Sequence, residues 1–398
     1  MKSVRLPAAG LILGLLLTAC GPAATSPADI GTVVALTLQA LTPAVSQATA
    51  TPPAPAPDQL PHPLYFLKDD NAGLKQIYRL ARDGSALQQL TFEPAAVGTY
   101  DVSPVDGSIA YISNNVLLWA DSNGAGRRTL VDGGTQPTDN NFMQRVGSPV
   151  WSPDGGTIAY AYDGLNFYDV ASGASRRLLE NQIDMSAGFP IVGELFGPNE
   201  YSPDGSKLLI NIGFNEAGTL AIYDPAGGAI TRFNHPDGSL VCCTASWVPD
   251  GSGLYVANRE IGMLDSGLWF VSAVSGEVST LLPGSAPDDT YNSAYAPIVG
   301  PDGLLYFFFN NLPTSPTLHS PLFMVRAGPD GVSGRMQLRP EAFENINDAA
   351  WSPDASVAAL AIGASADDYQ GGQALAVYMD GRPVVILAEG VSQMKWGP

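Results

Sequence analysis

The chain has 398 residues, of which 45% are hydrophobic and only 14% are charged, and it contains 43 glycines and 33 prolines. This composition is typical of a folded, turn-rich β protein. Acidic residues outnumber basic ones by 38 to 19, which gives a formal net charge of −19. Affinity for phosphate groups needs a basic face, so nucleic acid and the bare surface of an anionic membrane are excluded as expected partners.

The amino terminus has the features of an export signal. A basic start, Met1 to Arg5, precedes an apolar stretch over residues 11–17 that is too short to span a membrane. Leu17-Thr18-Ala19-Cys20 places small residues ahead of a cysteine. It resembles a bacterial lipobox, which implies that residues 1–19 are removed and that Cys20 carries a lipid. A plain secretory signal followed by an incidental cysteine is the alternative.

Residues 20–61 are rich in Ala, Thr, Ser and Pro, most clearly over 51–57. A segment of this composition cannot bury a core, and it acts as a semi-extended spacer. We therefore expect a lipid-anchored linker over 20–61 and a folded domain over 62–398.

One short phrase returns along the folded domain. Its copies are Ser103-Pro104-Val105-Asp106-Gly107, Trp151-Ser152-Pro153-Asp154-Gly155, Tyr201-Ser202-Pro203-Asp204-Gly205, Trp247-Val248-Pro249-Asp250-Gly251, Gly300-Pro301-Asp302-Gly303, Trp351-Ser352-Pro353-Asp354-Ala355 and a clipped Trp396-Gly397-Pro398. The prolines recur about every 45 to 52 residues, a period that indicates stacked or radially arranged supersecondary units.

Each period contains short runs with the composition and length of β-strands. In one period the runs are 157–160, 165–170 and 176–179, and a further strand ends at the aromatic residue of the phrase. Four strands joined by tight turns make one blade of a β-propeller. The sequence therefore predicts an all-β fold that consists of a single β-propeller.

The Pro-Asp-Gly element has a local structural role in this interpretation. Proline presets one φ angle, and Asp and Gly tolerate unusual φ values, so the element forms the turn after the innermost strand. A calcium-binding or catalytic carboxylate at the repeated Asp is the alternative. A turn residue that recurs once per blade is more often structural.

The two ends of the folded domain give the number of blades. Residues 64–67, 76–80 and 87–91 supply strands two to four of a blade that lacks its first strand, and residues 391–398 supply an unaccompanied first strand. Pairing of these ends closes the ring and leaves no free sheet edge inside it. Six full phrases and this composite blade predict seven four-stranded blades.

The repeat resembles that of the TolB-like propellers, whose blades carry a Trp-Ser-Pro-Asp-Gly hairpin followed by similar strands. Residues 151–160, Tyr168-Asp169 and Arg176-Arg177-Leu178-Leu179 carry the resemblance, which extends over roughly 62–398. The same WD40-like repeat occurs in the propeller domains of prolyl-oligopeptidase and dipeptidyl-peptidase-IV-type proteins, and here we expect no hydrolase domain beside it. TolB itself has an α/β domain before a six-bladed ring, so its specific role is not implied.

Besides Cys20, the cysteines are the neighbours Cys242 and Cys243. Adjacent thiols can join in an oxidising compartment. The geometry is awkward, because consecutive Cα atoms lie about 3.8 Å apart whereas ordinary disulfides prefer at least about 4.4 Å. A vicinal disulfide and two unbridged small hydrophobic residues both stay open as interpretations.

Propeller ligands usually bind at a mouth of the central channel, where non-repeating loops gather. We expect this mouth where the loops enter the innermost strands, opposite the Pro-Asp-Gly turns. The candidate ligand-face residues are Tyr100, Arg145, Glu194, Glu200, Cys242, Cys243, Tyr291, Asn292, Asp348 and Lys395. Asp101 and Asn347 are expected at the same mouth.

The sequence predicts no catalytic residue, no metal site and no cofactor. It lacks a Gly-x-Ser-x-Gly elbow, and His62, His235 and His319 have no metal-ligand spacing to another His or Cys. Only His319 is expected near the mouth, and a solvated loop position explains it.

Two functions from different classes fit these features. The first is a monomeric, lipid-anchored binding or scaffold module on the extracellular face or in the periplasm, with an envelope protein, peptide or glycan as its partner. The second is a propeller hydrolase or lyase that acts on extracellular carbohydrate or peptide. Buried titratable groups with shifted pKa values at the channel would favour the enzyme, and a shallow polar mouth would favour binding.

Overall fold

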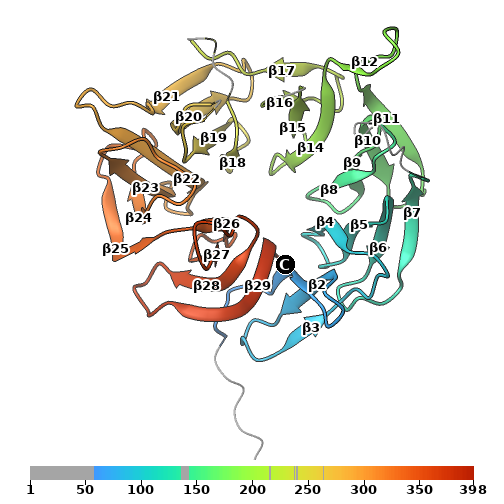
Figure 1. Cartoon of the computed structure of the whole chain (residues 1–398), viewed down its shortest axis with the longest axis horizontal. Helices are drawn as coiled ribbons and strands as arrows, with labels where there is room; N and C mark the ends of the chain where they lie inside the picture. The colour runs from blue at the N-terminus through green and yellow to red at the C-terminus, as the bar shows by residue number, and fades with distance from the viewer. Residues whose placement is uncertain (1–57, 136–142, 215–216, 237, 239–240, 263) are drawn as a thin grey trace, which may run out of the picture. The chain divides into compact units, whose positions relative to one another are not determined.

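The computed structural model describes residues 58–135, 143–214, 217–236, 238, 241–262 and 264–398. These residues form a closed ring of antiparallel sheets around a central axis (Figure 1). All the regular elements of this described part are strands, so it includes no helix able to cross a bilayer. The predicted signal peptide, Cys20 and nearly all of the linker lie outside the described residues.

Five four-stranded sheets form one blade each, with the strands in sequence order across the sheet. Blade 1 consists of β4 (Val97–Val102), β5 (Ile109–Ser113), β6 (Val116–Ala120) and β7 (Arg128–Asp132). Blade 2 consists of β8 (Gly147–Trp151), β9 (Thr157–Ala161), β10 (Gly164–Asp169) and β11 (Ser175–Glu180). Blade 3 consists of β14 (Leu195–Tyr201), β15 (Leu208–Gly213), β16 (Gly218–Tyr223) and β17 (Ile230–Arg232). Blade 4 consists of β18 (Thr244–Trp247), β19 (Gly253–Asn258), β20 (Gly267–Ser272) and β21 (Val278–Leu282). Blade 5 consists of β22 (Tyr291–Val299), β23 (Leu305–Leu312), β24 (Leu322–Ala327) and β25 (Met336–Phe343).

The other two blades share one strand within a seven-stranded sheet. Its strands are, in spatial order, β26 (Ile346–Trp351), β27 (Val357–Ile362), β28 (Gly372–Tyr378), β29 (Val385–Trp396), β1 (Leu64–Asp69), β2 (Lys75–Leu80) and β3 (Leu87–Gln89). A small hairpin, β12 (Ile183–Asp184) with β13 (Ile191–Val192), connects blades 2 and 3.

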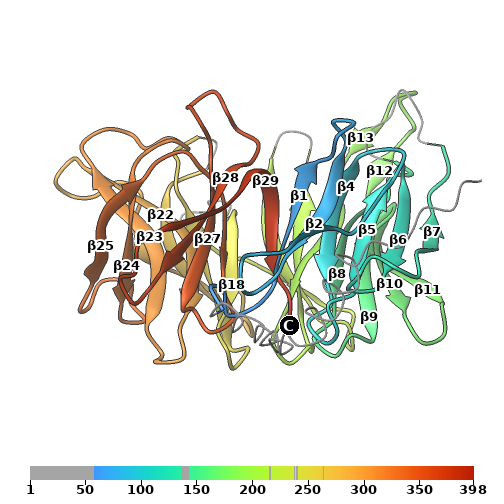
Figure 2. The ribbon, with the colours of Figure 1, turned by 90° about the horizontal axis from the view of Figure 1, so that it is seen from below.

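The shared strand β29 closes the ring. Its first part pairs with β28 as the outer strand of blade 6, and its last part pairs with β1 as the inner strand of blade 7. Val391 is paired on both sides, and Trp396 lies opposite Leu64. Figure 2 shows β29 and β1 side by side. The predicted seven blades and their closure by the two ends of the domain are confirmed.

The hydrophobic core lies between neighbouring blades, because each sheet has apolar side chains on both faces. One buried cluster joins Tyr65 and Leu67 of blade 7 to Val97 and Tyr111 of blade 1. Leu60 is also buried, against blades 6 and 7, so the packed part of the chain begins before His62. Burial of this kind stabilises the ring as a whole, since a single blade would leave both of its faces in water.

The Pro-Asp-Gly turns are held together by their own side chains. In blade 3, Asp204 Oδ1 accepts hydrogen bonds from Ser202 Oγ at 2.7 Å and from the Ser206 backbone N–H at 3.0 Å. The following residue, Gly205, has a φ of 71°, a value that favours glycine. The bonds from Ser202 and Ser206 lower the pKa of Asp204 to about 2. The repeated aspartate therefore acts as a turn residue.

Candidate ligand site in the central channel

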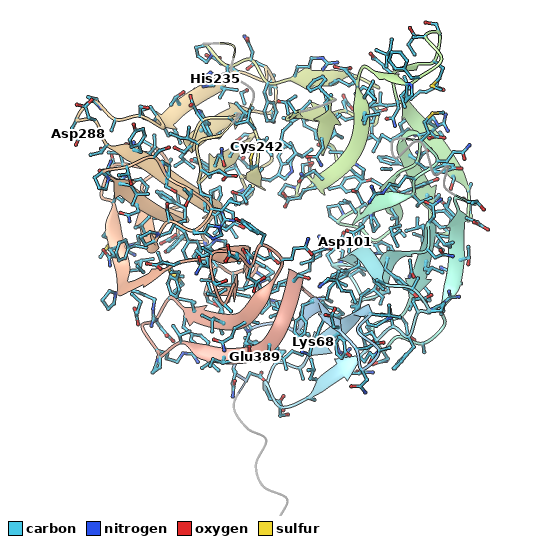
Figure 3. The ribbon with its side chains drawn as sticks, in the orientation of Figure 1. Lys68, Asp101, His235, Cys242, Asp288 and Glu389 are labelled. Carbon is cyan, nitrogen blue, oxygen red and sulfur yellow. A yellow bond between two sulfur atoms is a disulfide. The ribbon has the colours of Figure 1, made fainter. Side chains whose placement is uncertain are left out.

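Seven equivalent residues, each three positions before the proline of a phrase, line the centre of the ring. These channel positions are Asp101, Val150, Glu200, Ser246, Ile298, Ala350 and Lys395. All seven border one of two adjoining cavities, and Figure 3 places the side chain of Asp101 at the central opening. Four of the seven are uncharged, so the three charged residues are departures from the repeat.

Six of the seven innermost strands contain a β-bulge within three residues before the channel position, and the described part of the blade 4 strand is the exception. Ser148, Ala296 and Gln393 adopt positive φ values of 49°, 48° and 52° at these bulges. A bulge bends the strand and redirects the side chains that follow it. The bulges therefore help to set how the channel positions face the axis.

The turn-side cavity has a volume of about 540 Å³. It reaches three prolines of the Pro-Asp-Gly turns, Pro104, Pro153 and Pro203. Its aromatic lining residues are Trp151, Tyr201, Trp351 and Trp396. Side chains accessible from the channel thus extend toward the turns as well as toward the mouth expected from the sequence.

The second cavity, here called the Cys-side cavity, has a volume of about 350 Å³ and is lined by Cys243 and Thr244 among others. Asn199, Glu200, Ala245 and Trp351 border both cavities. Among the described residues, Glu200 is therefore the only charged one that borders both cavities.

Lys395 and Asp101 form an ion pair across the contact between blades 7 and 1, with Nζ and Oδ1 2.9 Å apart. The other carboxylate oxygen of Asp101 accepts a hydrogen bond from the Trp151 backbone N–H at 2.7 Å. Burial alone would lower the pKa of Lys395, but the attraction of Asp101, Glu200 and Asp348 outweighs it and raises that pKa. Lys395 stays charged, and Asp101 neutralises it.

Asp348 and Arg259 also have partners within the protein. Asp348 Oδ2 accepts a hydrogen bond from the Met394 backbone N–H at 2.6 Å, and burial raises the pKa of Asp348. The Arg259 guanidinium lies 4.4 Å from the centre of the Tyr295 ring and donates to the Ile346 carbonyl. Burial lowers the pKa of Arg259. Both charges are held in place before any ligand arrives.

Glu200 differs from these groups, because its carboxylate has no hydrogen bond or ion pair with any described residue. The side chain is reached by water in the channel but is surrounded by protein. The surrounding protein groups displace part of the hydration of this exposed carboxylate and raise the pKa of Glu200 to about 7, with Lys395 opposing the rise and Asp101 adding to it. Among the described residues that line the two cavities, Glu200 thus carries the carboxylate left free.

Cys242 and Cys243 are joined by a disulfide in the structure. Cys243 is exposed and lines the Cys-side cavity, whereas Cys242 is partly buried. Of the predicted ligand-face residues, the structure brings Cys243 and Glu200 to one cavity, and Lys395 and Glu200 to the other. Asp348 interacts electrostatically with Lys395.

The other predicted ligand-face residues lie elsewhere. Tyr100 is buried and donates to the Gln393 carbonyl at 2.6 Å. Glu194 pairs with Arg232 at 2.7 Å near the β12–β13 hairpin.

Arg145 is exposed and lines a separate cavity of about 560 Å³ between blades 1 and 2. Asn292 is buried and donates to the Pro283 carbonyl at 2.8 Å, and Tyr291 begins β22 beside it. His319 contacts Asn345 Oδ1 at 3.1 Å and the ring of Tyr369, with centroids 5.2 Å apart, so it is tied to its neighbours. Within the described ranges, no three His, Cys, Asp or Glu side chains are grouped to hold a metal ion.

Sequence reasoning missed the aromatic lining of the channel. Trp151, Tyr201, Trp351 and Trp396 directly follow channel positions, and the sequence presented them only as ends of the innermost strands. The signal that could have found them is an aromatic residue at one repeat position in most blades. The sequence could not have identified Arg259 in this way, because it lies in a loop after β19 that is not part of the repeat.

No protein-family model matches this chain, and neither does any curated protein. Among solved structures, a functionally unknown protein from Desulfotomaculum acetoxidans is similar with a TM-score of 0.54 and 13% identity, covering 84% of this chain and 98% of that one. A prolyl endopeptidase is similar with a TM-score of 0.52 and 12% identity, and 85% of this chain covers 49% of that protein. An oligogalacturonate lyase in complex with manganese is similar with a TM-score of 0.51 and 16% identity, covering 76% of this chain and 82% of the lyase.

TolB from Acinetobacter baumannii is also similar, with a TM-score of 0.42 and 15% identity over 68% of this chain and 62% of TolB. This chain thus spans less than two thirds of that TolB and about half of the prolyl endopeptidase. Such low identities show the fold alone. The chain is a seven-bladed β-propeller, similar in fold to a prolyl endopeptidase and to an oligogalacturonate lyase.

Proposed function

We propose that this chain is an exported, lipid-anchored, monomeric β-propeller that binds a protein, peptide or glycan of the cell envelope in its central channel. The export signal and Cys20 support the location, and the low content of basic residues argues against nucleic acid. The two adjoining cavities, of about 540 and 350 Å³, have the size of small-ligand sites and support the channel as the place of binding.

One observation carries this proposal: at the junction of the two cavities, the Glu200 carboxylate makes no hydrogen bond or ion pair with the described part of the chain. The equivalent residues of four other blades are uncharged. Folding therefore does not require a charge at this position. A charged group left free in a concave site is what recognition of a ligand needs.

The same geometry argues for binding over hydrolysis. Glycoside hydrolysis by the usual mechanism takes two carboxylates, one as acid and one as base or nucleophile. Asp101 is held by Lys395 and Asp348 by the Met394 N–H, so only Glu200 is free to take either role.

An enzyme is the second candidate, and a specific observation favours it. The channel contains titratable groups with shifted pKa values, and the pKa of Glu200, about 7, suits a general acid or base at neutral pH. Propeller-containing peptidases and lyases share this fold. Turnover of polygalacturonate or of a proline-containing peptide that disappears in Glu200→Gln would establish catalysis.

Binding is tested with the full-length protein purified in detergent micelles. Thermal unfolding is followed with envelope glycans and peptides, because a ligand that binds only the folded state must raise the midpoint. We expect a rise for wild type that Glu200→Gln reduces. If no compound raises the midpoint and affinity capture from envelope extract recovers no partner, the binding proposal is wrong.

The anchor is tested separately by cell fractionation. Wild type is expected in the membrane fraction and Cys20→Ala outside it, since the acyl chains supply the membrane affinity. A Cys20→Ala protein that is exported and still fractionates with membranes would contradict a lipid anchor on this residue.

A further inference from the structure

The turn-side cavity also indicates which chemical group it takes. We propose that Glu200 binds the ammonium group of an amine-bearing ligand, which the aromatic side chains of the turn-side cavity enclose. This inference rests on the proposed function and specifies the ligand of the same site.

The charged residues of the turn-side cavity leave one unbalanced negative charge. Asp101, Glu200 and Lys395 are the charged residues that line the turn-side cavity. Asp101 and Lys395 neutralise each other at 2.9 Å. What remains is the single negative charge of Glu200, which a ligand with one positive group would match.

An anionic ligand fits the same cavity poorly. It would have to separate Lys395 from Asp101, and it would then lie close to both carboxylates. Arg259, a buried cation that lines neither cavity, is already engaged by Tyr295 and by the Ile346 carbonyl. Like charges in close contact are unfavourable, so the cavity selects against anions.

The aromatic lining of the turn-side cavity also suits a cation. Three tryptophans and one tyrosine border the turn-side cavity, namely Trp151, Trp351, Trp396 and Tyr201. Aromatic faces attract cations within about 6 Å, most strongly where water is excluded. A carboxylate among aromatic rings is a combination that recognises ammonium groups.

Hydrogen bonds fix two of these aromatic side chains, Trp351 and Trp396. Trp351 Nε1 donates to the Ala296 carbonyl at 2.7 Å, and Trp396 Nε1 donates to the Ala350 carbonyl at 3.0 Å. Each bond joins one blade to the preceding one, so the ring positions these side chains before a ligand binds. Preorganised groups lose little entropy on binding, which favours affinity.

The raised pKa of Glu200 is consistent with this assignment. The surrounding protein displaces part of the hydration of the carboxylate and Asp101 repels it, while Lys395 compensates in part. An ammonium group bound here would supply the missing counter-charge and lower the pKa of Glu200. Amine binding should therefore release protons from the protein near neutral pH.

The test is isothermal titration of the full-length protein in detergent micelles, in an amine-free buffer at pH 7.5. Two matched pairs of probes differ in the charge of one group: glucosamine against N-acetylglucosamine, and N-acetyl-lysine amide against N-acetyl-norleucine amide. We expect the amine member of at least one pair to bind about tenfold or more tighter, as a charge-assisted contact implies. Glu200→Gln should remove this preference, whereas Glu277→Gln, an exposed residue of blade 4 outside both cavities, should keep it.

The comparison within each pair uses the wild-type protein, so it does not depend on the folding of a variant. Equal affinities within both pairs, or binding of the neutral members alone, would overturn the amine assignment and leave binding in the channel intact. An amine preference that persists in folded Glu200→Gln would also overturn it. Failure of all four probes overturns the amine assignment, and only the lack of any partner from envelope extract would remove the proposed function as well.

Discussion

Glu200 and Asp204 lie close together at the end of β14, yet their environments are opposite. One oxygen of the Asp204 carboxylate, Oδ1, accepts three hydrogen bonds from Ser202 and Ser206, which lower its pKa to about 2. The Glu200 carboxylate makes no hydrogen bond or ion pair with another described residue, and loss of hydration among the surrounding protein groups raises its pKa to about 7. The aspartate recurs in most blades and the glutamate in none.

This contrast teaches how to separate structure from function in a repeat protein. A residue required by the fold recurs in each blade and finds its hydrogen bonds within the repeat. A residue retained for another reason breaks the repeat and keeps bonding capacity free. Substitutions at charged and turn residues, changes of pH and reduction of the disulfide test this contrast through their effects on stability.

Lys395→Met should have the largest effect. It leaves Asp101, whose side chain is 14% exposed, without its counter-charge. We expect a loss of about 2 kcal/mol in the free energy of unfolding, measured by urea denaturation. The double variant with Asp101→Asn should recover most of this loss. Additive effects of the two substitutions would show that the ion pair is not the cause.

The repeated turn offers a matched pair of glycine and alanine. Gly205 has a φ of 71°, and a Cβ added there would first meet Pro153 at 3.5 Å, an ordinary contact, so Gly205→Ala isolates the backbone strain. We expect a cost of about 1 kcal/mol. Ala355 stands at the equivalent position in blade 6 with a φ of 54°, and Ala355→Gly should be neutral or stabilising in the same urea assay. Destabilisation by Ala355→Gly would mean that its buried methyl outweighs the strain.

The pH dependence of stability should separate the two carboxyls by sign. The folded-state pKa of Glu200, about 7, exceeds its ordinary value of 4.5. Between these two pH values the folded protein binds more protons than the unfolded chain, so its stability falls as the pH rises from 4.5 to about 7. Glu200→Gln should abolish this small decline between pH 5 and 8 in thermal melts. An identical pH profile for wild type and variant would contradict the raised pKa.

Asp204 should behave in the opposite way. Its folded-state pKa, about 2, lies below the ordinary value of 3.8, so its stabilising effect is present above pH 3.8 and is lost as the pH falls through about 2. Asp204→Asn should therefore lower the midpoint at neutral pH and flatten the decline below pH 4. A variant as stable as wild type at neutral pH would show that the turn does not depend on this charge.

Reduction of the Cys242–Cys243 disulfide should have the smallest effect on stability. A bond between neighbours encloses no intervening residues, so it restricts the unfolded chain very little. We expect mass spectrometry to show no alkylation of either cysteine without reductant, and double alkylation with little change in midpoint after reduction. Full alkylation without reductant would mean that the two thiols are free.

The sequence predicted the fold well because the repeat is local. The Pro-Asp-Gly phrase, the strand runs around it and the incomplete first and last blades were enough for seven blades and their closure. The channel was predicted only in part. Glu200 and Lys395 were identified by their place in the repeat, but their different roles depend on partners from other blades, such as Asp101 for Lys395. Tyr100 and Asn292 share that strand environment and are nevertheless buried, because their hydrogen-bond partners come from distant segments.

The most direct test of the account is to measure amine binding and thermal stability together for Glu200→Gln and Asp204→Asn, two isosteric changes at the end of the same strand. We predict that Glu200→Gln loses amine affinity and keeps a thermal midpoint at pH 7.5 at least as high as that of wild type. Asp204→Asn should keep its amine affinity and have a lower thermal midpoint. The reverse pattern, or equal effects of both changes on both quantities, would contradict the assignment of the repeated acid to structure and the unrepeated acid to binding.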